Sequence, residues 1–339
     1  MTEGILWAVF AGTTLGLYAL PEKFAKGFAF ENTWGLMFFI NMLLVPVIAA
    51  FLLIHGFADV LTSLPAGVLL KMTVASILWG IGVMMWGKAI NYIGLSLGFS
   101  LFIGTVILVG SLLPFLVDAT PDTSVLLTIL AGIVVVLLGV LANGRAGILR
   151  QATLRQAGGG ALPTTQSGNM SRGILIAVAG GLLATGFSYA NAVGRPILHE
   201  ACQAQGNPEW VTAVAVMFII YVAGALFVIP YFLFQLSQKG LWANFSSPYM
   251  GRNLGLTAVM AILNFVASAA FAFAAFKLGK AGNTVGYAIF NTVCVAVAIV
   301  SGLVTGEWAG ASASARRFLY IGLGAMMLGV LIIAMGNGM

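Results

Sequence analysis

The stretch "WGIGVMMWGKAINYIGLSLGFSLFIG", residues 79–104, is apolar over most of its length, with Lys88 and Asn91 as its strongly polar exceptions. A helix needs about 20 apolar residues to cross a bilayer, and comparable runs recur along the whole chain. Because lipid cannot hydrogen-bond to a free backbone, only helices or a closed barrel can span it. Barrel strands alternate polar and apolar residues, whereas these runs do not. The sequence therefore predicts an all-α membrane protein.

The composition supports the same fold class. Of the 339 residues, 60% are hydrophobic and only 7% are charged, whereas about a quarter are charged in a soluble domain. The two cysteines, Cys202 and Cys294, suggest no disulfide framework. The N-terminal segment lacks the basic region and cleavage site of a removable signal peptide. We therefore expect it to form the first membrane helix.

Several function classes lack support in the sequence. It contains no nucleotide-binding P-loop, and no selectivity-filter-like segment or ring of acids that would indicate a channel. It contains no catalytic triad and no cluster of metal ligands. The net charge of +6 is accounted for by basic cytoplasmic loops. We expect a protein that is not an enzyme, with no cofactor, no metal and no nucleic-acid partner.

Ten apolar segments are expected to cross the bilayer. They lie at residues 4–21, 34–54, 68–90, 95–117, 124–143, 172–192, 210–236, 254–276, 283–305 and 317–336. The longest polar interruption, residues 144–171, is rich in Gly, Ser and Thr and contains arginines but no acidic residue. This composition is typical of a flexible linker. It would separate two five-helix halves, residues 1–143 and 172–339.

The charges predict the orientation of these helices. Eleven of the 15 Lys and Arg residues fall in loops on one side of the membrane: Lys23, Lys26, Lys88, Arg145, Arg150, Arg155, Arg172, Lys239, Arg252, Arg316 and Arg317. Cytoplasmic loops carry the excess of Lys and Arg in membrane proteins. The linker is therefore expected in the cytoplasm and both termini in the periplasm.

The two halves are expected to be inverted repeats. When the chain is shifted by 185 residues, "INYIGLSLG" (residues 90–98) falls on "AFKLGKAGN" (residues 275–283), with Gly94 on Gly279. The identity is thin, but an odd number of helices in each half necessarily inverts the second copy. Inverted repeats occur in many secondary transporters, which bind their solute near the membrane midplane at the repeat interface.

The sequence resembles the L-rhamnose–proton symporter family, within the drug/metabolite transporter superfamily. The resemblance is carried by "YALPEKFAKGFAFENTW" (18–34), "WGIG" (79–82), "YIGLSLGFSLFIGTVILVGSLLP" (92–114), "GRAGILR" (144–150), "GRPILHEA" (194–201) and "GEWAGASASARR" (306–317). It implies ten helices as inverted repeats in a bacterial inner membrane. It also implies proton-coupled symport of a rhamnose-like deoxysugar or related monosaccharide by alternating access.

Two alternatives differ from this expectation. Within the transporter class, the protein could be an exporter or facilitator of another small metabolite, such as an amino acid. An intramembrane enzyme acting on lipid is the rival from a different class. That enzyme would need a nucleophile and a base clustered within the membrane, and the apolar segments supply no such cluster. The expected partners are therefore a small polar solute, protons and the lipid bilayer.

Three residues of the opening stretch are candidates for contacting the solute. Trp79 and Trp86 are seven residues apart and lie on nearly the same helical face, where aromatic rings could stack on a sugar. The alternative is packing against neighbouring helices or a place in an interfacial aromatic belt. Lys88 either extends to the cytoplasmic interface or faces the cavity, where it could bind an acidic group.

Hydroxyl and amide side chains are the other candidates for binding the solute. Asn91 lies at the predicted turn between the third and fourth helices, and Ser96 and Ser100 share a face of the fourth. An amide donates and accepts hydrogen bonds, as a sugar hydroxyl does, and polar groups in a bilayer face the protein interior. Some could merely bridge helices. The amides of the second half are Asn191, Asn264, Asn283 and Asn291.

The segment "RPILHE" (residues 195–200) is the strongest cluster of ionisable residues. It is expected just past the sixth helix, on the outer side. Histidine is the side chain whose unperturbed pKa lies nearest neutrality, and apolar surroundings can raise the pKa of a carboxyl group. His199 and Glu200 are therefore the candidates for proton coupling. The alternative is a solvated loop with a local ion pair.

Overall fold

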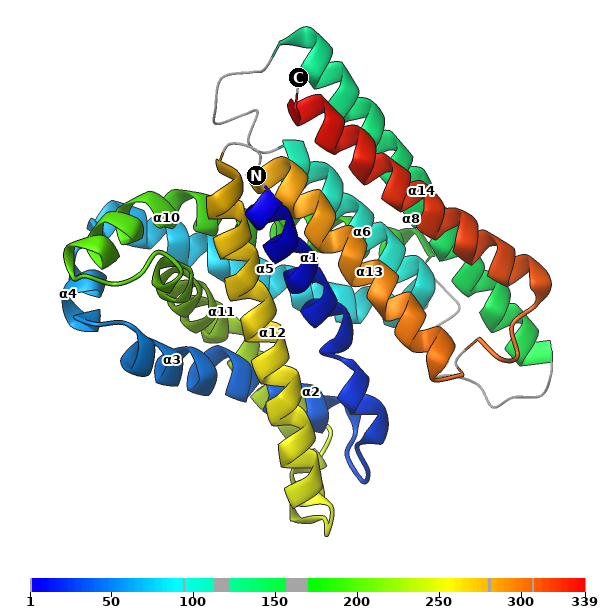
Figure 1. The fold of residues 1–339 in the computed structure, drawn as a ribbon. Helices are drawn as coiled ribbons and strands as arrows, with labels where there is room; N and C mark the ends of the chain where they lie inside the picture. Colours follow the sequence, from blue (N-terminus) through cyan, green and yellow to red (C-terminus); the bar gives the residue numbers. More distant parts are fainter. Residues whose placement is uncertain are drawn as a thin grey trace. The chain divides into compact units, whose positions relative to one another are not determined.

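A computed structural model describes residues 2–93, 95–112, 122–156, 170–279, 282–306 and 308–338, which form helices and short connections (Figure 1). No strand occurs in these ranges, so the all-α fold class is confirmed. The chain divides into two compact units. Unit 1 comprises Met1–Gly80 and Gly186–Lys277, and unit 2 comprises Ile81–Thr185 and Leu278–Met339. Each unit thus takes segments from both predicted halves.

Unit 1 is built from long apolar helices joined by short turns. Four of the connections contain a glycine with positive φ, namely Gly27, Gly56, Gly206 and Gly240, a conformation that glycine adopts without steric cost. The elements are α1 (Thr2–Leu17), η1 (Leu20–Phe24), α2 (Phe30–Phe39), η2 (Ile40–Leu44), α3 (Val45–Leu53), α4 (Phe57–Thr62), the first part of α5 (Ala66–Ile93), α10 (Gly186–Ala204), α11 (Val211–Gln238), η3 (Leu241–Ser246) and α12 (Met250–Leu278).

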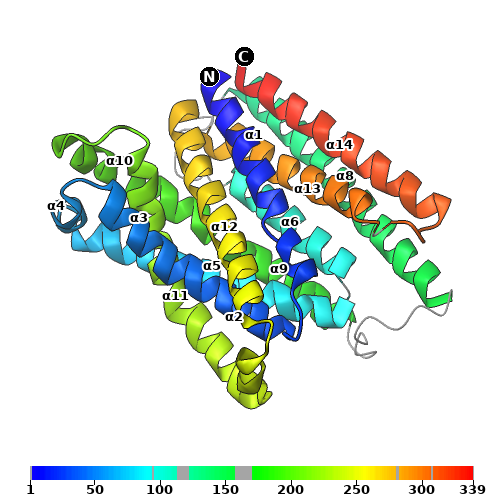
Figure 2. The same cartoon turned by 60° about the horizontal axis from the view of Figure 1, so that its bottom comes forward.

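Unit 2 contains a closely packed antiparallel pair of helices, α8 and α14, which lie side by side in Figures 1 and 2. A Cβ atom built on Gly139 would lie 2.6 Å from the carbonyl oxygen of Gly322, and one on Gly132 would lie 2.8 Å from that of Gly329. Glycine at these positions therefore lets the two backbones approach. The elements are the rest of α5, α6 (Leu95–Leu112), α8 (Thr123–Gln156), α9 (Met170–Ala184), η5 (Gly282–Gly286), α13 (Tyr287–Val304) and α14 (Ala313–Gly338).

Nine helical stretches of the described residues are long and apolar enough to cross a membrane. They are Thr2–Phe24, Phe30–Leu53, Ala66–Ala89, Thr123–Arg150, Ser171–Ala204, Val211–Gln238, Met250–Leu278, Tyr287–Val304 and Ala313–Gly336. The predicted segment 95–117 corresponds to α6, whose apolar part, Leu101–Gly110, is shorter. Residues 113–117 lie outside the described residues, so ten spans stay a prediction.

The helices extend further into the polar segments than the sequence indicates. Helix α8 continues through "GRAGILRQATLRQ" (144–156), the first part of the predicted flexible linker. Ala, Leu, Arg and Gln in this segment are strong helix formers, and the segment also packs against α14, where Ala146 contacts Leu319 in a buried cluster. Residues 157–169 lie outside the described residues.

The predicted loop position of "RPILHE" is wrong, because these residues lie inside α10. Proline and charged residues are usual signals of a helix end, and they led to the expectation of a loop. Helix α10 continues past Pro196 because Leu198 and Cys202, on its apolar face, are buried at 1% and 0% exposure. Membrane helices tolerate an internal proline where neighbouring groups satisfy the freed backbone.

Candidate functional site

Two glycines allow helix α10 to pack closely against α5. A Cβ atom on Gly186 would overlap the carbonyl oxygen of Ala75, and one on Gly194 would overlap the sulfur atom of Met72. A larger residue at Gly186 would push the two helices apart, because it would meet backbone atoms of α5, whereas the flexible Met72 side chain can move away from Gly194. Both glycines face α5, and other positions on α10 contribute side chains to the recess described below.

A column of polar side chains runs along α10. Ser188, Asn191 and Arg195 follow one another at helical spacing, so they share a face. Ser188 and Asn191 are 3% and 0% exposed. The Ser188 hydroxyl, both polar atoms of the Asn191 amide and the Nη1 atom of Arg195 are buried and find no hydrogen-bond partner among the described residues. Such groups are rare in folded proteins, and each one calls for an explanation.

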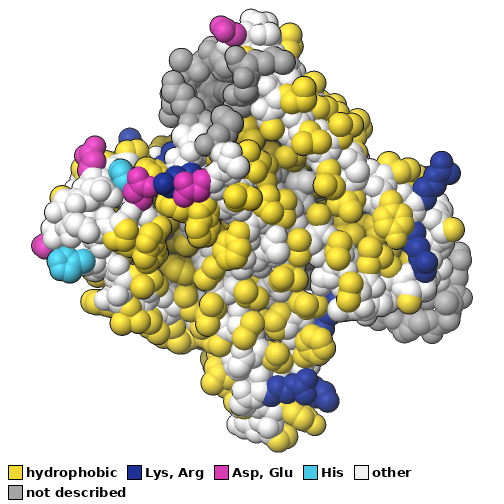
Figure 3. Space-filling model, viewed as in Figure 1, with side chains coloured by type: hydrophobic (Ala, Val, Ile, Leu, Met, Phe, Trp, Pro, Cys, Tyr) yellow, Lys and Arg dark blue, Asp and Glu magenta, His cyan; other side chains and the backbone are white. Residues whose placement is uncertain are grey.

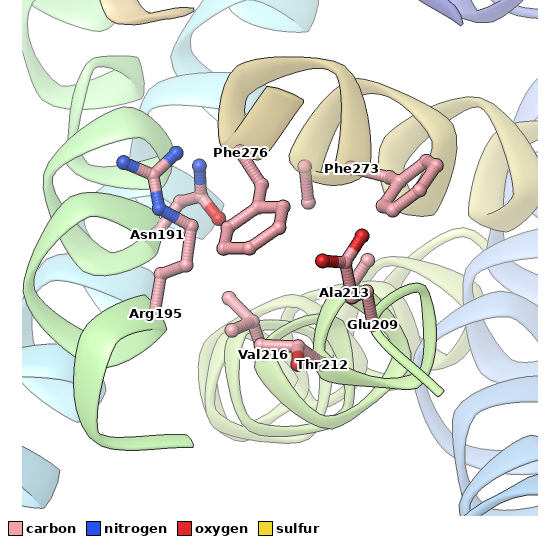
Figure 4. A pocket seen from close by; sticks show the side chains of 9 residues that line it. Asn191, Arg195, Glu209, Thr212, Ala213, Val216, Phe273 and Phe276 are labelled. Atoms are coloured by element: carbon pink, nitrogen blue, oxygen red, sulfur yellow. The ribbon is translucent and has the colours of Figure 1, made fainter. Parts of the chain in front are cut away.

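Asn191 and Arg195 line a narrow recess in unit 1 (Figure 4). As it stands, the recess has no room for a water molecule, whereas ligand pockets begin at roughly 300 Å³. Figure 4 shows Asn191 and Arg195 on one side and the ring of Phe276 beside them, with Phe273 and Glu209 further along. The complete lining is Asn191, Arg195, Glu209, Thr212, Ala213, Val216, Ala272, Phe273 and Phe276. The recess therefore combines polar groups with aromatic rings.

Ionisable groups lie at the Glu209 side of this recess. The Nζ atom of Lys277 is 2.5 Å from Oε2 of Glu209 and 3.6 Å from Oε2 of Glu3. The hydrogen bond and positive charge of Lys277 lower the pKa of Glu209, and the charge of His199 contributes in the same direction. His199 Nδ1 is 3.1 Å from the Thr212 hydroxyl. This group therefore ties α1, α10, α11 and α12 together.

A second polar cluster in unit 1 is internally hydrogen-bonded. The Tyr221 hydroxyl donates to Oδ1 of Asn264 at 2.8 Å and lies 2.5 Å from the Ser268 hydroxyl. Nδ2 of Asn41 also donates to Oδ1 of Asn264, at 2.9 Å. Asn41 lies in the π-helical turn η2, a distortion often found at functional sites. The Trp79 ring is 5.3 Å from that of Tyr221.

The whole sequence matches a family of sugar symporters. A family model described as L-rhamnose-proton symport protein (RhaT) matches residues 1–339. The chain belongs to this family. Three similar relatives are L-rhamnose-proton symporters. Those of Citrobacter koseri and Escherichia coli O157:H7 are each 25% identical over 346 residues, which cover 99% of this chain and 98% of the relative. That of Yersinia pestis (strain Pestoides F) is 25% identical over 345 residues, which cover 98% of this chain and 97% of the relative.

Membership of the RhaT family decides the function class. The family's activity is proton-coupled sugar symport, so the expectations of a sugar–proton symporter and of a transporter rather than an enzyme are confirmed. The expected sugar and proton partners follow from the same membership. The nine apolar helical stretches among the described residues fit a multi-pass membrane protein.

The structure brings together some of the residues predicted to serve this RhaT-family symporter. In unit 1, Trp79 contacts Tyr221, whose hydroxyl binds Asn264, and Asn191 lies on the same helix as His199. Glu200, next to His199, is exposed.

The other candidates lie in unit 2. The Trp86 ring lies 6.0 Å from that of Phe102, and Lys88 is exposed near the end of α5. Asn291 is 6% exposed and donates to the carbonyl oxygen of Tyr287 on its own helix. The remaining predicted side chains lie outside the described ones: Asn91, Ser96, Ser100 and Asn283.

Sequence reasoning missed the members of the hydrogen-bonded cluster other than Asn264. One signal was available for Asn41, which is the only strongly polar side chain in the apolar segment 34–54. Tyr221 and Ser268 gave no comparable signal, because tyrosine and serine are common packing residues in membrane helices. Ser188 was also missed, although its spacing from Asn191 and Arg195 places it on their face.

Proposed function

We propose that this protein takes up L-rhamnose or a related deoxysugar together with protons, and that the polar face of α10 contributes to sugar binding. The observation that carries the proposal is Asn191, which is fully buried while both polar atoms of its amide lack a hydrogen-bond partner among the described residues. A sugar hydroxyl would supply both an acceptor and a donor. This would offset the cost of leaving the amide unpaired, about 1–3 kcal/mol.

Neighbouring side chains support the same assignment. The Arg195 guanidinium carries several donors in a fixed geometry, and Ser188 can donate or accept. Phe276, beside Asn191 and Arg195 in the recess, offers an aromatic surface to the apolar face of a deoxysugar. The recess is narrower than a sugar requires, which is consistent with a closed conformation in an alternating-access cycle.

The other sequence-based assignments belong to this proposal. The chain would form ten membrane helices as two inverted repeats, residues 1–143 and 172–339, joined by a cytoplasmic linker at 144–171. It would lie in the bacterial inner membrane with both termini in the periplasm. The additional residues proposed to line the sugar path are Trp79, Trp86, Lys88, Asn91, Ser96, Ser100, Asn264, Asn283 and Asn291.

We assign proton coupling to His199 and Glu200, in keeping with their position on the helix that carries Asn191. A symporter needs a group that takes up a proton on one side and releases it on the other. The charge of His199 acts on Glu209, so protonation of His199 would alter the interactions that tie α10 to α11 and α12. Such a local change of charge can bias a conformational equilibrium.

Uptake by proteoliposomes tests the sugar and the site. Wild type is expected to accumulate labelled L-rhamnose under an inward proton gradient, and to lose accumulation when an ionophore collapses that gradient.

Asn191→Ala and Ser188→Ala should weaken sugar binding by about 1–3 kcal/mol each. The matched control is Ser76→Ala, because Ser76 is also buried but its hydroxyl already donates to the carbonyl oxygen of Met72 at 2.6 Å. Equal effects of Ser188→Ala and Ser76→Ala would remove Ser188 from the site.

The same vesicles test the coupling residues. Glu200→Gln and His199→Ala are expected to abolish accumulation driven by the proton gradient while sparing part of the sugar counterflow. Counterflow needs binding and conformational exchange but no net proton movement, so it separates coupling from binding. Normal accumulation by both variants would assign coupling to other residues.

A further inference from the structure

Four arginines whose side chains the structure describes lie at one end of the α8–α14 pair in unit 2. Arg145 and Arg150 are near the end of α8, and Arg316 and Arg317 are at the start of α14. Because the two helices are antiparallel, these ends adjoin. Figure 3 shows dark blue Lys and Arg side chains at this end of the pair.

Aromatic rings fix the orientation of two of these arginines. The Cζ atom of Arg145 lies 5.0 Å from the ring centroid of Phe318, and that of Arg150 lies 5.3 Å from the ring centroid of Trp308. Trp308 is 9% exposed and belongs to the buried cluster that joins the two helices. The positive charges are therefore held in place by the fold.

The partners of these arginines among the described residues are neutral. Nη2 of Arg316 donates to the carbonyl oxygens of Trp308 and Ala309, at 3.1 and 2.9 Å. None of the four arginines forms an ion pair within the described residues. Glu307, the nearest acid in the sequence, lies outside them, and a single carboxylate would neutralise only one of the four charges. The cluster thus retains a net positive charge.

The helix itself adds to the attraction for an anion. The start of a helix carries a partial positive charge, which disfavours cations and favours anions. Arg316 and Arg317 lie at the start of α14, the end that disfavours cations. The Ser312 hydroxyl, just before this helix, accepts a hydrogen bond from the Ala315 amide at 3.2 Å. An anion bound here would interact favourably with both the arginines and the helix.

Apolar side chains adjoin the arginines. A recess at the start of α14 is lined by Ala311, Ala313, Arg316, Arg317, Tyr320 and Ile321. Tyr320 and Ile321 are 55% and 51% exposed. Since α14 is a candidate membrane span from Ala313 onward, the arginines lie where the helix enters the bilayer and Ile321 lies further along it. A cationic group followed by an apolar surface matches a ligand with an anionic head and a hydrocarbon tail.

We propose that this end of the α8–α14 pair binds the phosphate headgroup of an anionic phospholipid. Arg316 and Arg317 would hold the phosphate, and Tyr320 and Ile321 would contact the first part of an acyl chain. Basic pockets at the ends of membrane helices recognise anionic headgroups in this way. Free phosphate has the same charged group, but it would make no use of the exposed apolar side chains. This inference is independent of the proposed sugar site.

Lipid titrations of the purified full chain in neutral detergent test the proposal. Phosphatidylglycerol, phosphatidylcholine and inorganic phosphate are added separately, and the apparent Kd is measured by native mass spectrometry and by the shift in unfolding temperature. Wild type should bind phosphatidylglycerol more tightly than phosphatidylcholine. Arg317→Gln, at an exposed position, should weaken phosphatidylglycerol binding about fivefold, and Arg316→Gln with Arg317→Gln should weaken it further.

The matched control is Arg252→Gln, which removes an exposed arginine at the start of α12 in unit 1. It should leave phosphatidylglycerol affinity close to that of wild type. Equal weakening by Arg252→Gln and Arg317→Gln would attribute binding to overall charge and overturn the proposal. Equal binding of phosphatidylcholine would also overturn it. Inorganic phosphate that stabilises the protein as well as phosphatidylglycerol does would replace the lipid site with a free-anion site.

Discussion

At the scale of single residues, the polar side chains of unit 1 separate into paired and unpaired groups. The cluster around Asn264 is internally satisfied at its centre, where one amide oxygen accepts from both Tyr221 and Asn41. The α10 face carries buried atoms with no partner among the described residues. The first arrangement holds helices together and leaves one atom, Oδ1 of Asn41, buried without a partner among the described residues. The second has more hydrogen-bonding capacity left for a solute, from Ser188, Asn191 and Arg195.

Removing the shared acceptor should therefore lower stability. Asn264→Ala leaves the buried Tyr221 hydroxyl and Asn41 amide without their common partner, which should cost about 1–3 kcal/mol for each unpaired group. Thermal unfolding in detergent measures this loss, and sugar titration of the same samples measures the expected weakening of binding. A variant as stable as wild type would show that the cluster contributes nothing to folding.

The pairing of Glu209 predicts a pH dependence of stability. Lys277 lowers the pKa of this carboxyl from its ordinary value of 4.5. A carboxyl whose pKa is lower in the folded state stabilises the fold above its unfolded pKa, and this contribution is lost as the pH falls through the folded pKa. Wild type should therefore lose more stability than Glu209→Gln when the pH is lowered below about 4.5. The unfolding temperatures of both proteins are measured between pH 7 and pH 3. An equal fall in unfolding temperature for wild type and Glu209→Gln would contradict this prediction.

At the scale of elements, helix ends depend on packing as well as on local sequence. Helix α8 passes through a glycine- and arginine-containing segment, and α10 passes through Pro196 and two charged residues. In both cases the continuing turns bury apolar side chains, for example Ala146 and Leu198 at 0% and 1% exposure. This burial opposes the local signals for a loop.

The α8–α14 contact should be sensitive to side-chain size at Gly139. A Cβ atom there would lie 2.6 Å from the carbonyl oxygen of Gly322 and 2.8 Å from the backbone nitrogen of Met326, and these backbone atoms cannot move without shifting α14. Gly139→Leu should destabilise the protein by about 1–3 kcal/mol. Gly324→Leu is the matched control, because a Cβ atom at Gly324 meets nothing within 4 Å. The unfolding temperature of Gly139→Leu should fall well below that of Gly324→Leu, and equal unfolding temperatures would contradict the prediction.

At the scale of the whole molecule, each compact unit combines an early and a late part of the chain. Two lysines of unit 1 form ion pairs with residues far from them in the chain. Lys277 pairs with Glu209 and Glu3, whereas Lys239 pairs with Glu31.

The orientation in the membrane is tested by chemical labelling. A cysteine introduced at position 160, with Cys202 and Cys294 replaced by alanine, should resist an impermeant thiol reagent in intact cells and react after the membrane is opened. The expectation rests on the excess of Lys and Arg in the loops assigned to that side. Ready labelling in intact cells would reverse the assigned orientation, and with it the periplasmic position of both termini.

The sequence by itself determined the fold class and most of the membrane segments, because the length and apolarity of a spanning helix are properties of a continuous stretch of chain. It also indicated the family through short segments spread over the whole length. Only the tertiary structure decided which polar atoms are paired. Ser76 and Ser188 are both buried serines in apolar helices, yet only the Ser76 hydroxyl has a partner among the described residues. Hydrogen bonds also join residues far apart in the chain, as in Asn41 and Asn264. Such pairings depend on how helices pack against one another, which no local pattern specifies.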